Sequence, residues 1–471
     1  MLKKIFHSSI LNSWFSNIIV IISMLIAIPF VITKLSIEEV NVWFLFATIV
    51  SLTQGVVLGF SATFSRFISY VYAGVSLNEV TTLKEKNHIS HSEINILELE
   101  QILNVVKPLY FILSIVFFFL LSFMGYFFLS KPISMMQNST EGWYAWFTVL
   151  FTSGIVLYLN FYQVFLDGIN KVALVQRIIG IINFFGIFII LLVLIFIPSL
   201  FSITIIYQFI LLVVSITIAY FSKKNMNELA LNINIYSFDK NIFFLIWKTA
   251  RKSLYTTILA SIVKHISSLI VAQLLPPAQS ASFQFVKRIF DVIERFTATT
   301  FQSKIPMLSR LRGRGDIRSF SKTLAKTQYI TYSVFLVGYS IFLLFGDLIV
   351  NLIDSTIQLN NILIIAFGFS ILITRWTGMN LAVSNQANNV VEHLAISVSS
   401  VIYFLLIYIF IDDISVYIFP IAQIFAMFLI SPFVVKQVYQ TFNSDFLIYE
   451  SKILLPVFIA TTIISLIAVK F

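Results

Sequence analysis

Long apolar runs alternate with short polar segments along the whole chain. Each run has about the 20 residues that a helix needs to cross the roughly 30 Å hydrocarbon core of a bilayer. Two groups of six runs are separated by a polar stretch at 222–252 and followed by one more run. The predicted spans are 14–33, 42–73, 108–129, 143–166, 178–197, 201–221, 253–275, 279–301, 328–346, 361–382, 391–411, 415–435 and 453–469.

This grouping predicts an all-α integral membrane fold made of two six-helix lobes. A thirteenth helix is expected at the carboxyl end, because the run at 453–469 follows both groups of six. The predicted parts are an N-terminal lobe at 1–221, a cytoplasmic linker at 222–252, a C-terminal lobe at 253–436 and a C-terminal extra helix at 437–471.

The two halves also show a weak internal repeat. A shift of 240 residues places Leu35 on Leu275 and Trp43 on Phe283, and each pair lies near the turn between the first two helices of a half. Halves that cross the membrane in the same direction form parallel repeats, related by a pseudo-twofold axis along the membrane normal. We therefore predict two lobes around a central cavity.

Composition supports the membrane assignment and excludes several kinds of chemistry. The chain is 59% hydrophobic and 11% charged, whereas an ordinary soluble domain has about 25% charged residues. It has no cysteine, so disulfides, thiol catalysis and cysteine-based metal sites are excluded. Lys3 and Lys4 precede the first run as in a signal peptide, but the length of this run favours an uncleaved first span.

The distribution of basic residues predicts the topology. With a cytoplasmic amino terminus, 22 of the 31 Lys and Arg residues lie in segments on the inner side and 3 lie in segments on the outer side. Cytoplasmic loops of membrane proteins carry such a positive excess. The net charge of +10 is therefore explained by topology, and a nucleic acid partner is not needed.

The stretch VKRIFDVIERF at 286–296 places five charges inside a predicted span. At about 100° per residue they fall within roughly a third of a helix circumference. An isolated charge in hydrocarbon costs on the order of 2.5 to 3.5 kcal/mol, so this face requires water or partner charges. The five residues are Lys287, Arg288, Asp291, Glu294 and Arg295.

Other spans of the second half add polar residues. The 253–275 run has a narrow polar stripe, and Arg375 lies within the 361–382 run. The stripe consists of Thr257, Ser261, Lys264 and Ser268, with His265 beside it. Arg66 lies near the inner end of the second span, where a snorkelling side chain is the favoured interpretation.

Two interpretations of these charges remain open. Lys287 with Asp291, and Asp291 with Arg295, are spaced i, i+4 and could neutralise each other within the lobe. Alternatively, the faces line a cavity for an anionic substrate, because the basic residues exceed the two acids that could pair with them. These acids, Asp291 and Glu294, are then candidates for a proton or sodium step.

Motifs for enzymatic chemistry are not found. No phosphate-binding loop, dinucleotide fingerprint or nucleophile elbow is present, so we expect neither an enzyme nor a cofactor. His88 and His91 could bind a metal, but a solvated loop is favoured and no metal site is predicted. Asp167 with Gly168 is interpreted as the end of the fourth span.

Three segments resemble the Wzx-type polysaccharide flippases of the multidrug/oligosaccharidyl-lipid/polysaccharide exporter superfamily. The stretch ITKLSIEEVNVWFLFATIVSLTQGVVLGFSATFSRFISY at 32–70 is similar to the opening of these proteins. KIPMLSRLRGRGD at 304–316 and NLAVSNQANN at 380–389 are similar to the segments after their eighth and tenth helices. Residues that match the usual pattern of the opening are Leu35, Trp43, Gly59, Arg66 and Ser69, whereas Ser36 and Asn41 stand at positions that are usually glycine.

The resemblance implies a flippase for O-antigen or capsule repeat units on undecaprenyl pyrophosphate in a bacterial inner membrane. The cations at Arg66, Lys264, His265, Lys287, Arg288, Arg295 and Arg375 would contact the pyrophosphate. Thr257, Ser261, Ser268 and Asn380 would contact sugars. Membrane lipids, H+ or Na+, and the polymerase and chain-length proteins of the same pathway are the other expected partners.

Related functions remain as alternatives. A peptidoglycan-precursor flippase would also require cations, whereas a multidrug exporter of this superfamily would normally require an acidic, aromatic pocket. A membrane polysaccharide polymerase or ligase, as a different class, would normally carry a large external loop, and the predicted topology has none.

Overall fold

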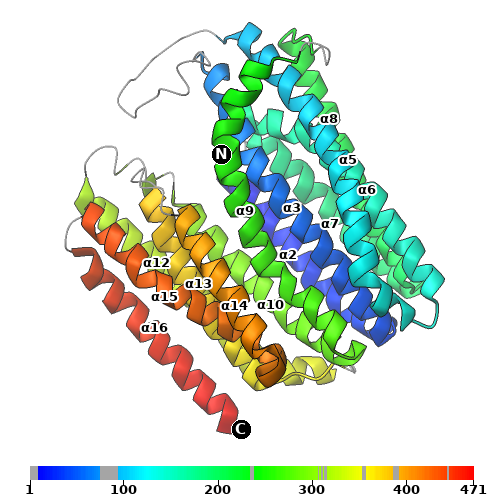
Figure 1. Cartoon of the computed structure of the whole chain (residues 1–471), viewed down its shortest axis with the longest axis vertical. Coiled ribbons are helices and arrows are strands. Elements are labelled where there is room, and N and C mark those ends of the chain that lie inside the picture. Colours follow the sequence, from blue (N-terminus) through cyan, green and yellow to red (C-terminus); the bar gives the residue numbers. More distant parts are fainter. Residues whose placement is uncertain are drawn as a thin grey trace. The chain divides into compact units, whose positions relative to one another are not determined.

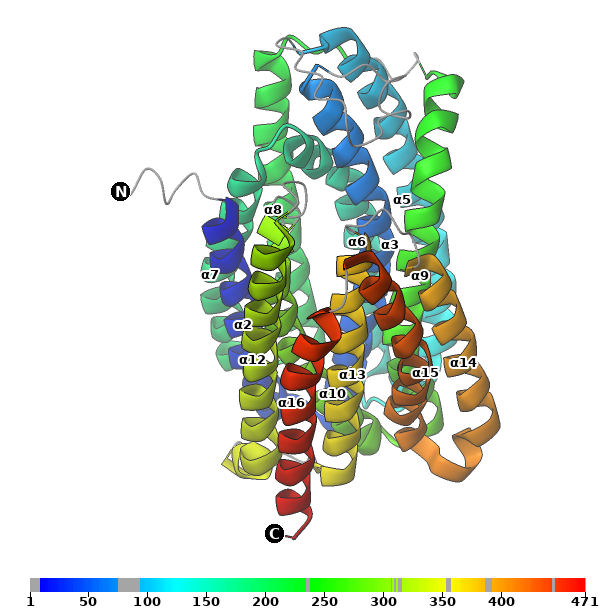
Figure 2. The ribbon, with the colours of Figure 1, turned by 90° about the vertical axis from the view of Figure 1, so that its left-hand side faces the viewer.

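The fold is described from a computed structural model of the 471-residue chain. All regular structure in the described residues is helical, as Figure 1 and Figure 2 show. The described residues are 9–74, 94–233, 238–305, 307–308, 311, 316–352, 357–385, 392–442 and 445–470.

Each predicted apolar run lies almost entirely within one α-helix, although several helices extend well beyond the run. This agreement confirms the all-α fold. A short 3-10 helix, η1 (Ser415–Tyr417), follows α14. The α-helices are α2 (Ser9–Lys34), α3 (Ile37–Tyr72), α5 (Ile96–Ser134), α6 (Ser139–Gly168), α7 (Val172–Phe196), α8 (Leu200–Glu228), α9 (Lys240–Leu274), α10 (Pro277–Gln302), α12 (Ile317–Leu352), α13 (Asn361–Asn385), α14 (Glu392–Ile414), α15 (Ile418–Phe442) and α16 (Asp445–Lys470).

Polar side chains fix the start of several helices. Ser36 and Glu39 form a capping box at α3, in which the Glu39 amide donates to Ser36 Oγ and the Ser36 amide donates to Glu39 Oε2. Asn95 caps α5, Asn138 caps α6 and Asp316 caps α12 in the same way, each by accepting a hydrogen bond from a backbone amide of the first turn. These caps satisfy amides that have no partner within the helix.

Length and composition identify a multi-pass membrane protein. Within the described residues, nine helical stretches are long and apolar enough to cross a bilayer, and one of them, His393–Lys436, covers both α14 and α15. The stretch Lys452–Ala468 of α16 is a shorter apolar helix. α10 is not among the nine, because its charged side chains lower its hydropathy.

The chain forms two compact units that divide inside α9, between His265 and Ile266. In unit 1, α6 packs against α3, α5, α7 and α8, while α2 packs mainly against α7. Buried aromatic residues, including Phe60, Phe64, Phe161 and Phe165, form its core. The predicted linker at 222–252 includes the last turns of α8 and the first turns of α9, and the predicted lobe boundaries stay predictions.

Unit 2 repeats the packing pattern of unit 1. Several packed helix pairs of unit 1 have counterparts in unit 2. In unit 1 these are α3 with α5, α3 with α6, α5 with α6, α6 with α8, and α7 with α8. The counterparts are α10 with α12, α10 with α13, α12 with α13, α13 with α15, and α14 with α15. Helices that pair in the same chain order in both units are what an internal repeat requires.

The C-terminal helix α16 belongs to unit 2 and packs on α12 and α13. The hydroxyl groups of Tyr339 on α12 and Ser465 on α16 are 2.6 Å apart and buried. The rings of Phe369 on α13 and Phe458 on α16 lie 5.3 Å apart. The thirteenth apolar run is therefore a helix that is attached to the second six by both polar and aromatic contacts.

Candidate functional site

The charged face of α10 is divided between buried and exposed side chains. Lys287 and Arg288 are buried, with exposed fractions of 7% and 8%. Asp291 and Glu294 are partly buried, and Arg295 is exposed. The sequence identified the charges, but their different environments depend on the helices that pack against α10, which the sequence pattern did not show.

Lys287 is held by hydroxyl groups of α9. Its Nζ atom donates hydrogen bonds to Ser267 Oγ at 2.8 Å and to Ser268 Oγ at 3.0 Å. These contacts replace part of the water that a buried ammonium group loses, which reduces the cost of its burial. Ser268 was a predicted site residue, and Ser267 was missed because it lies off the stripe that the helical angles define.

Arg375 of α13 is paired with Glu294 of α10. Its Nη2 atom lies 3.4 Å from Glu294 Oε1 and donates a hydrogen bond of 3.0 Å to the Glu294 carbonyl oxygen. The two side chains are largely buried, with exposed fractions of 14% and 27%. The structure thus brings one predicted cation and one predicted ion-coupling acid together, so Arg375 fixes α13 against α10.

Two further predicted cations are exposed. Lys264 on α9 and Arg295 on α10 both have exposed side chains. Within the described part of the chain, the Arg295 guanidinium forms no ion pair, so the suggested Asp291 to Arg295 pair is not present. Arg66 is also exposed on α3, whereas His265 on α9 is buried. An exposed cation keeps its capacity to bind an anion from outside the protein.

Thr257 and Ser261 lie against α3. A Cβ atom added at Gly59 would lie 3.2 Å from Thr257 Cβ, and one added at Gly55 would lie 2.7 Å from Ser261 Cβ. Two glycines spaced four apart allow such close approach of membrane helices. The predicted polar stripe of α9 therefore meets different neighbours, because Thr257 and Ser261 contact α3 whereas Ser268 contacts Lys287 of α10.

Asn380 is buried within α13. Its Nδ2 atom donates a hydrogen bond of 3.1 Å to the Trp376 carbonyl oxygen, one turn earlier in the same helix. Thr377, on the same helix, forms a hydroxyl contact with Ser431 of α15. The Thr377 contact lies at an interface between two helices of unit 2, and a contact of Asn380 with sugars stays a prediction.

Unit 1 contains a polar cluster that sequence reasoning missed. Asn160 Nδ2 donates to Ser61 Oγ at 2.9 Å, and Ser61 Oγ lies 3.0 Å from the Tyr110 hydroxyl. This cluster joins α6, α3 and α5. Nearby on α6, Gln163 hydrogen-bonds the carboxylate of Asp167, which directly precedes Gly168, the last residue of the helix, as predicted. No regular spacing signals a cluster that is drawn from three helices.

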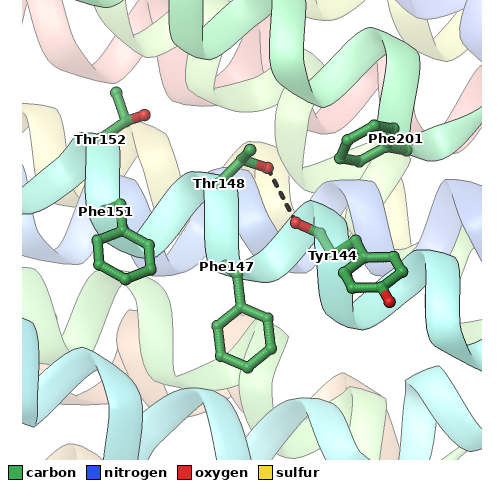
Figure 3. A pocket seen from close by; sticks show the side chains of 6 residues that line it. All are labelled: Tyr144, Phe147, Thr148, Phe151, Thr152 and Phe201. Carbon is green, nitrogen blue, oxygen red and sulfur yellow. Dashed lines mark hydrogen bonds between the residues drawn. The ribbon is translucent and has the colours of Figure 1, made fainter.

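Metal sites and pockets do not add a second candidate. The described residues contain no group of three or more side chains suited to a metal. His88 and His91 lie outside the described residues, as do parts of the 304–316 and 380–389 motifs. A hollow of about 330 Å³ lies between α6 and α8 and is lined mainly by Tyr144, Phe147, Phe151 and Phe201. Figure 3 shows these side chains. This lining carries no charge and suits an apolar chain rather than a pyrophosphate.

Together these features define an all-helical membrane protein with repeated helical units and a set of cations on α9, α10 and α13. Solved structures with the same fold are transporters. A multidrug resistance MATE family transporter of the MOP superfamily, in an inward-facing conformation, matches with a TM-score of 0.64 and 14% identity, over 92% of this chain and 99% of that one. MOP is the multidrug/oligosaccharidyl-lipid/polysaccharide exporter superfamily named above.

Two other structures give the same result. A MOP superfamily transporter from Pyrococcus furiosus matches with a TM-score of 0.60 and 14% identity, over 94% of this chain and 98% of that one. A Vibrio cholerae MATE transporter matches with a TM-score of 0.59 and 11% identity, over 93% and 96%. No protein family and no curated protein matches the sequence. At these identities the likeness establishes the fold.

Proposed function

We propose that this protein is a flippase that moves a lipid-linked oligosaccharide from the inner to the outer leaflet of a bacterial plasma membrane. The observation that carries the proposal is an excess of basic over acidic side chains within the predicted spans of α9, α10 and α13. These cations are Lys264 on α9, Lys287, Arg288 and Arg295 on α10, and Arg375 on α13, against the acids Asp291 and Glu294. Such an excess favours a substrate with negative charge.

The fold supports an alternating-access mechanism. Solved structures that match this chain include an inward-facing and an outward-facing conformation of a multidrug resistance MATE family transporter. In transporters built from repeats, one repeat rocks against the other around a site near the bilayer midplane. The same motion here would expose a bound headgroup first to the cytoplasmic side and then to the outer side.

The chemistry of the substrate matches the different side chains. A pyrophosphate requires charge-assisted hydrogen bonds, which the exposed Lys264 and Arg295 can supply. Sugars require neutral donors and acceptors, for which Ser261 and Asn380 remain candidates. The lipid tail would stay in the hydrocarbon throughout, so a lateral opening between helices is part of the proposal. The polymerase and chain-length proteins of the same pathway would receive the product.

The membrane potential can drive this transport. With a negative interior, outward movement of an anion gains about 2.3 kcal/mol per charge for each 100 mV. Inward movement of H+ or Na+ through Asp291 or Glu294 would add to this energy. We expect that neutralising both acids weakens the response of transport to an imposed ion gradient. An unchanged response would reject ion coupling through these residues.

The location of lipid-linked oligosaccharide in cells that lack the gene tests the flippase proposal. A membrane-impermeant glycan label is applied to intact spheroplasts and to inverted vesicles. Oligosaccharide should accumulate on the inner leaflet, and the unaltered gene should restore its export. Lys264→Ala and Arg295→Ala should fail to restore export, whereas Arg318→Ala, an equal change of charge at an exposed position on α12, should restore it.

Other outcomes would point to other functions. Repeat units that reach the outer leaflet but are not polymerised would indicate an enzyme that acts after translocation. Inner-leaflet accumulation of the peptidoglycan precursor would change the substrate but retain the flippase mechanism. A normal distribution of all labelled glycans, together with new sensitivity to cationic dyes, would indicate a multidrug exporter and refute the proposal.

A further inference from the structure

Two lysines from different helices meet on one side of unit 1. Partial burial disfavours the charged form of Lys107 on α5, and repulsion by the like charge of Lys223 on α8 adds to this effect. Lys223 Nζ lies 5.7 Å from the centre of the Tyr162 ring of α6, within the range of a cation–π contact. In the part of the chain that the structure describes, neither lysine forms an ion pair with a carboxylate. An anion placed between them would therefore relieve the repulsion.

Apolar side chains of α6 continue from this pair of lysines. α5 and α8 both pack against α6. At about 100° per residue, Phe151, Ile155, Tyr158 and Tyr162 lie on one face of α6, here called the α6 face. Phe151 and Ile155 are exposed by 59% and 49%. Phe111, one turn after Lys107 on α5, packs edge-on against Tyr158 at 6.0 Å, which bounds the α6 face on one side.

The pair of lysines lies at the level of lipid headgroups. Lys107 directly precedes the predicted span 108–129, and Lys223 follows the predicted span 201–221 by two residues. Both positions are cytoplasmic in the predicted topology, and the cytoplasmic leaflet attracts basic residues through its anionic lipids. From Tyr162 to Phe151 the α6 face covers about 16 Å. This is about half of the roughly 30 Å hydrocarbon core, which is the depth of one leaflet.

We propose that Lys107 and Lys223 bind the phosphate headgroup of an anionic phospholipid whose acyl chain lies along the exposed part of the α6 face, while the buried ring of Tyr162 holds Lys223 in place. A phospholipid fits this place because one molecule supplies both the charge and the apolar chain. Lys107 is only partly exposed, so its ammonium group gains more from a phosphate than a fully hydrated lysine would. The proposal goes beyond the flippase function, since this site lies on α5, α6 and α8 and involves none of the cations of the substrate site.

Binding of phosphatidylglycerol to the purified full-length protein in neutral detergent at low salt tests the site. A basic residue near an anionic lipid surface contributes about 1 kcal/mol, which corresponds to about a fivefold change in Kd. Lys107→Gln and Lys223→Gln should therefore each raise the Kd for fluorescent phosphatidylglycerol about fivefold, and the double variant should raise it about 25-fold. Phosphatidylcholine should compete poorly with the labelled lipid.

Lys224→Gln is the matched control, because Lys224 is the next residue of α8 and points about 100° away around the helix. It should change the Kd less than twofold. The variants Lys107→Arg and Lys223→Arg should retain binding, which separates the loss of charge from misfolding. An equal effect of Lys224→Gln would indicate diffuse surface charge and overturn the proposal. Equally strong competition by inorganic phosphate, or binding of a polyprenyl phosphate more than tenfold tighter, would also overturn it.

Discussion

The contact between Gly55 of α3 and Ser261 of α9 gives the sharpest test of the helix packing. In Gly55→Ala, the new Cβ would overlap the Ser261 hydroxyl and lie 2.7 Å from Ser261 Cβ. Rotation of Ser261 can move its hydroxyl but not its Cβ, so the helices must separate. Overpacking of this kind costs about 1 to 3 kcal/mol. The higher helix propensity of alanine offsets up to about 1 kcal/mol of this cost.

A second substitution isolates the steric part of this effect. Ser261→Gly removes both close atoms and leaves Ser261 Cα as the nearest one, at an ordinary distance of 3.9 Å. In a double-mutant cycle the propensity terms of the two positions cancel. The coupling energy between Gly55→Ala and Ser261→Gly should therefore equal the relief of overpacking, about 1 to 3 kcal/mol.

Reversible unfolding in mixed micelles of sodium dodecyl sulfate and a neutral detergent, followed by circular dichroism, measures the four free energies of the cycle. Gly378→Ala is the control, because a Cβ added at Gly378 meets no atom within 4 Å. It should be neutral or stabilising. A coupling energy below about 0.5 kcal/mol, which is the usual error of additivity, would show that α3 and α9 are not packed this closely.

Three further changes test other contacts of the fold. Glu294→Gln should destabilise the protein by roughly 1 to 3 kcal/mol in the same unfolding assay, because the Arg375 charge loses its partner, and Arg375→Gln should recover part of this loss. Tyr339→Phe should cost about 0.6 kcal/mol by removing the hydrogen bond to α16, and an unchanged stability would argue against that contact. The backbone amide and the side-chain hydroxyl of Ser319 donate hydrogen bonds to the Asp316 carboxylate and hold its pKa below the usual range. Protection of the first turn of α12 from hydrogen exchange should therefore persist above about pH 4 and fall at lower pH, and Asp316→Ala should abolish this dependence.

The number and order of the helices follow from the sequence because a bilayer leaves few choices. A backbone in hydrocarbon must satisfy its own hydrogen bonds, so an apolar run of spanning length becomes a helix. The helix ends were less predictable. α5 begins at Ile96, well before the predicted span at 108, because Leu99, Ile102 and Leu103 pack into the core of unit 1 as an amphipathic extension. Hydropathy alone does not distinguish such an extension from a loop.

The sequence identifies the residue types of the candidate site but not the helices that pack against each of them. Helical angles predict a common stripe of polar residues on α9, yet they do not show which helix packs against each part of it. Gly55 and Gly59 carried the missing signal, because their spacing of four marks a face where another helix approaches closely. The partners Thr257 and Ser261 show the same spacing. The Ser61, Tyr110 and Asn160 cluster depends on three separate helices, and no spacing within one helix predicts it.

The cations of the candidate site fall into two kinds that do different work. Lys287 and Arg375 already have protein partners, namely two hydroxyl groups of α9 and the carboxylate of Glu294. Removal of such a partner leaves a buried polar group unsatisfied, so these cations contribute to the position of α9, α10 and α13. Lys264 and Arg295 are exposed, so an anion can reach them from outside the protein. We therefore expect alanine at either exposed cation to weaken binding of the proposed substrate, while loss of Lys287 or Arg375 should first disturb the packing of its helix.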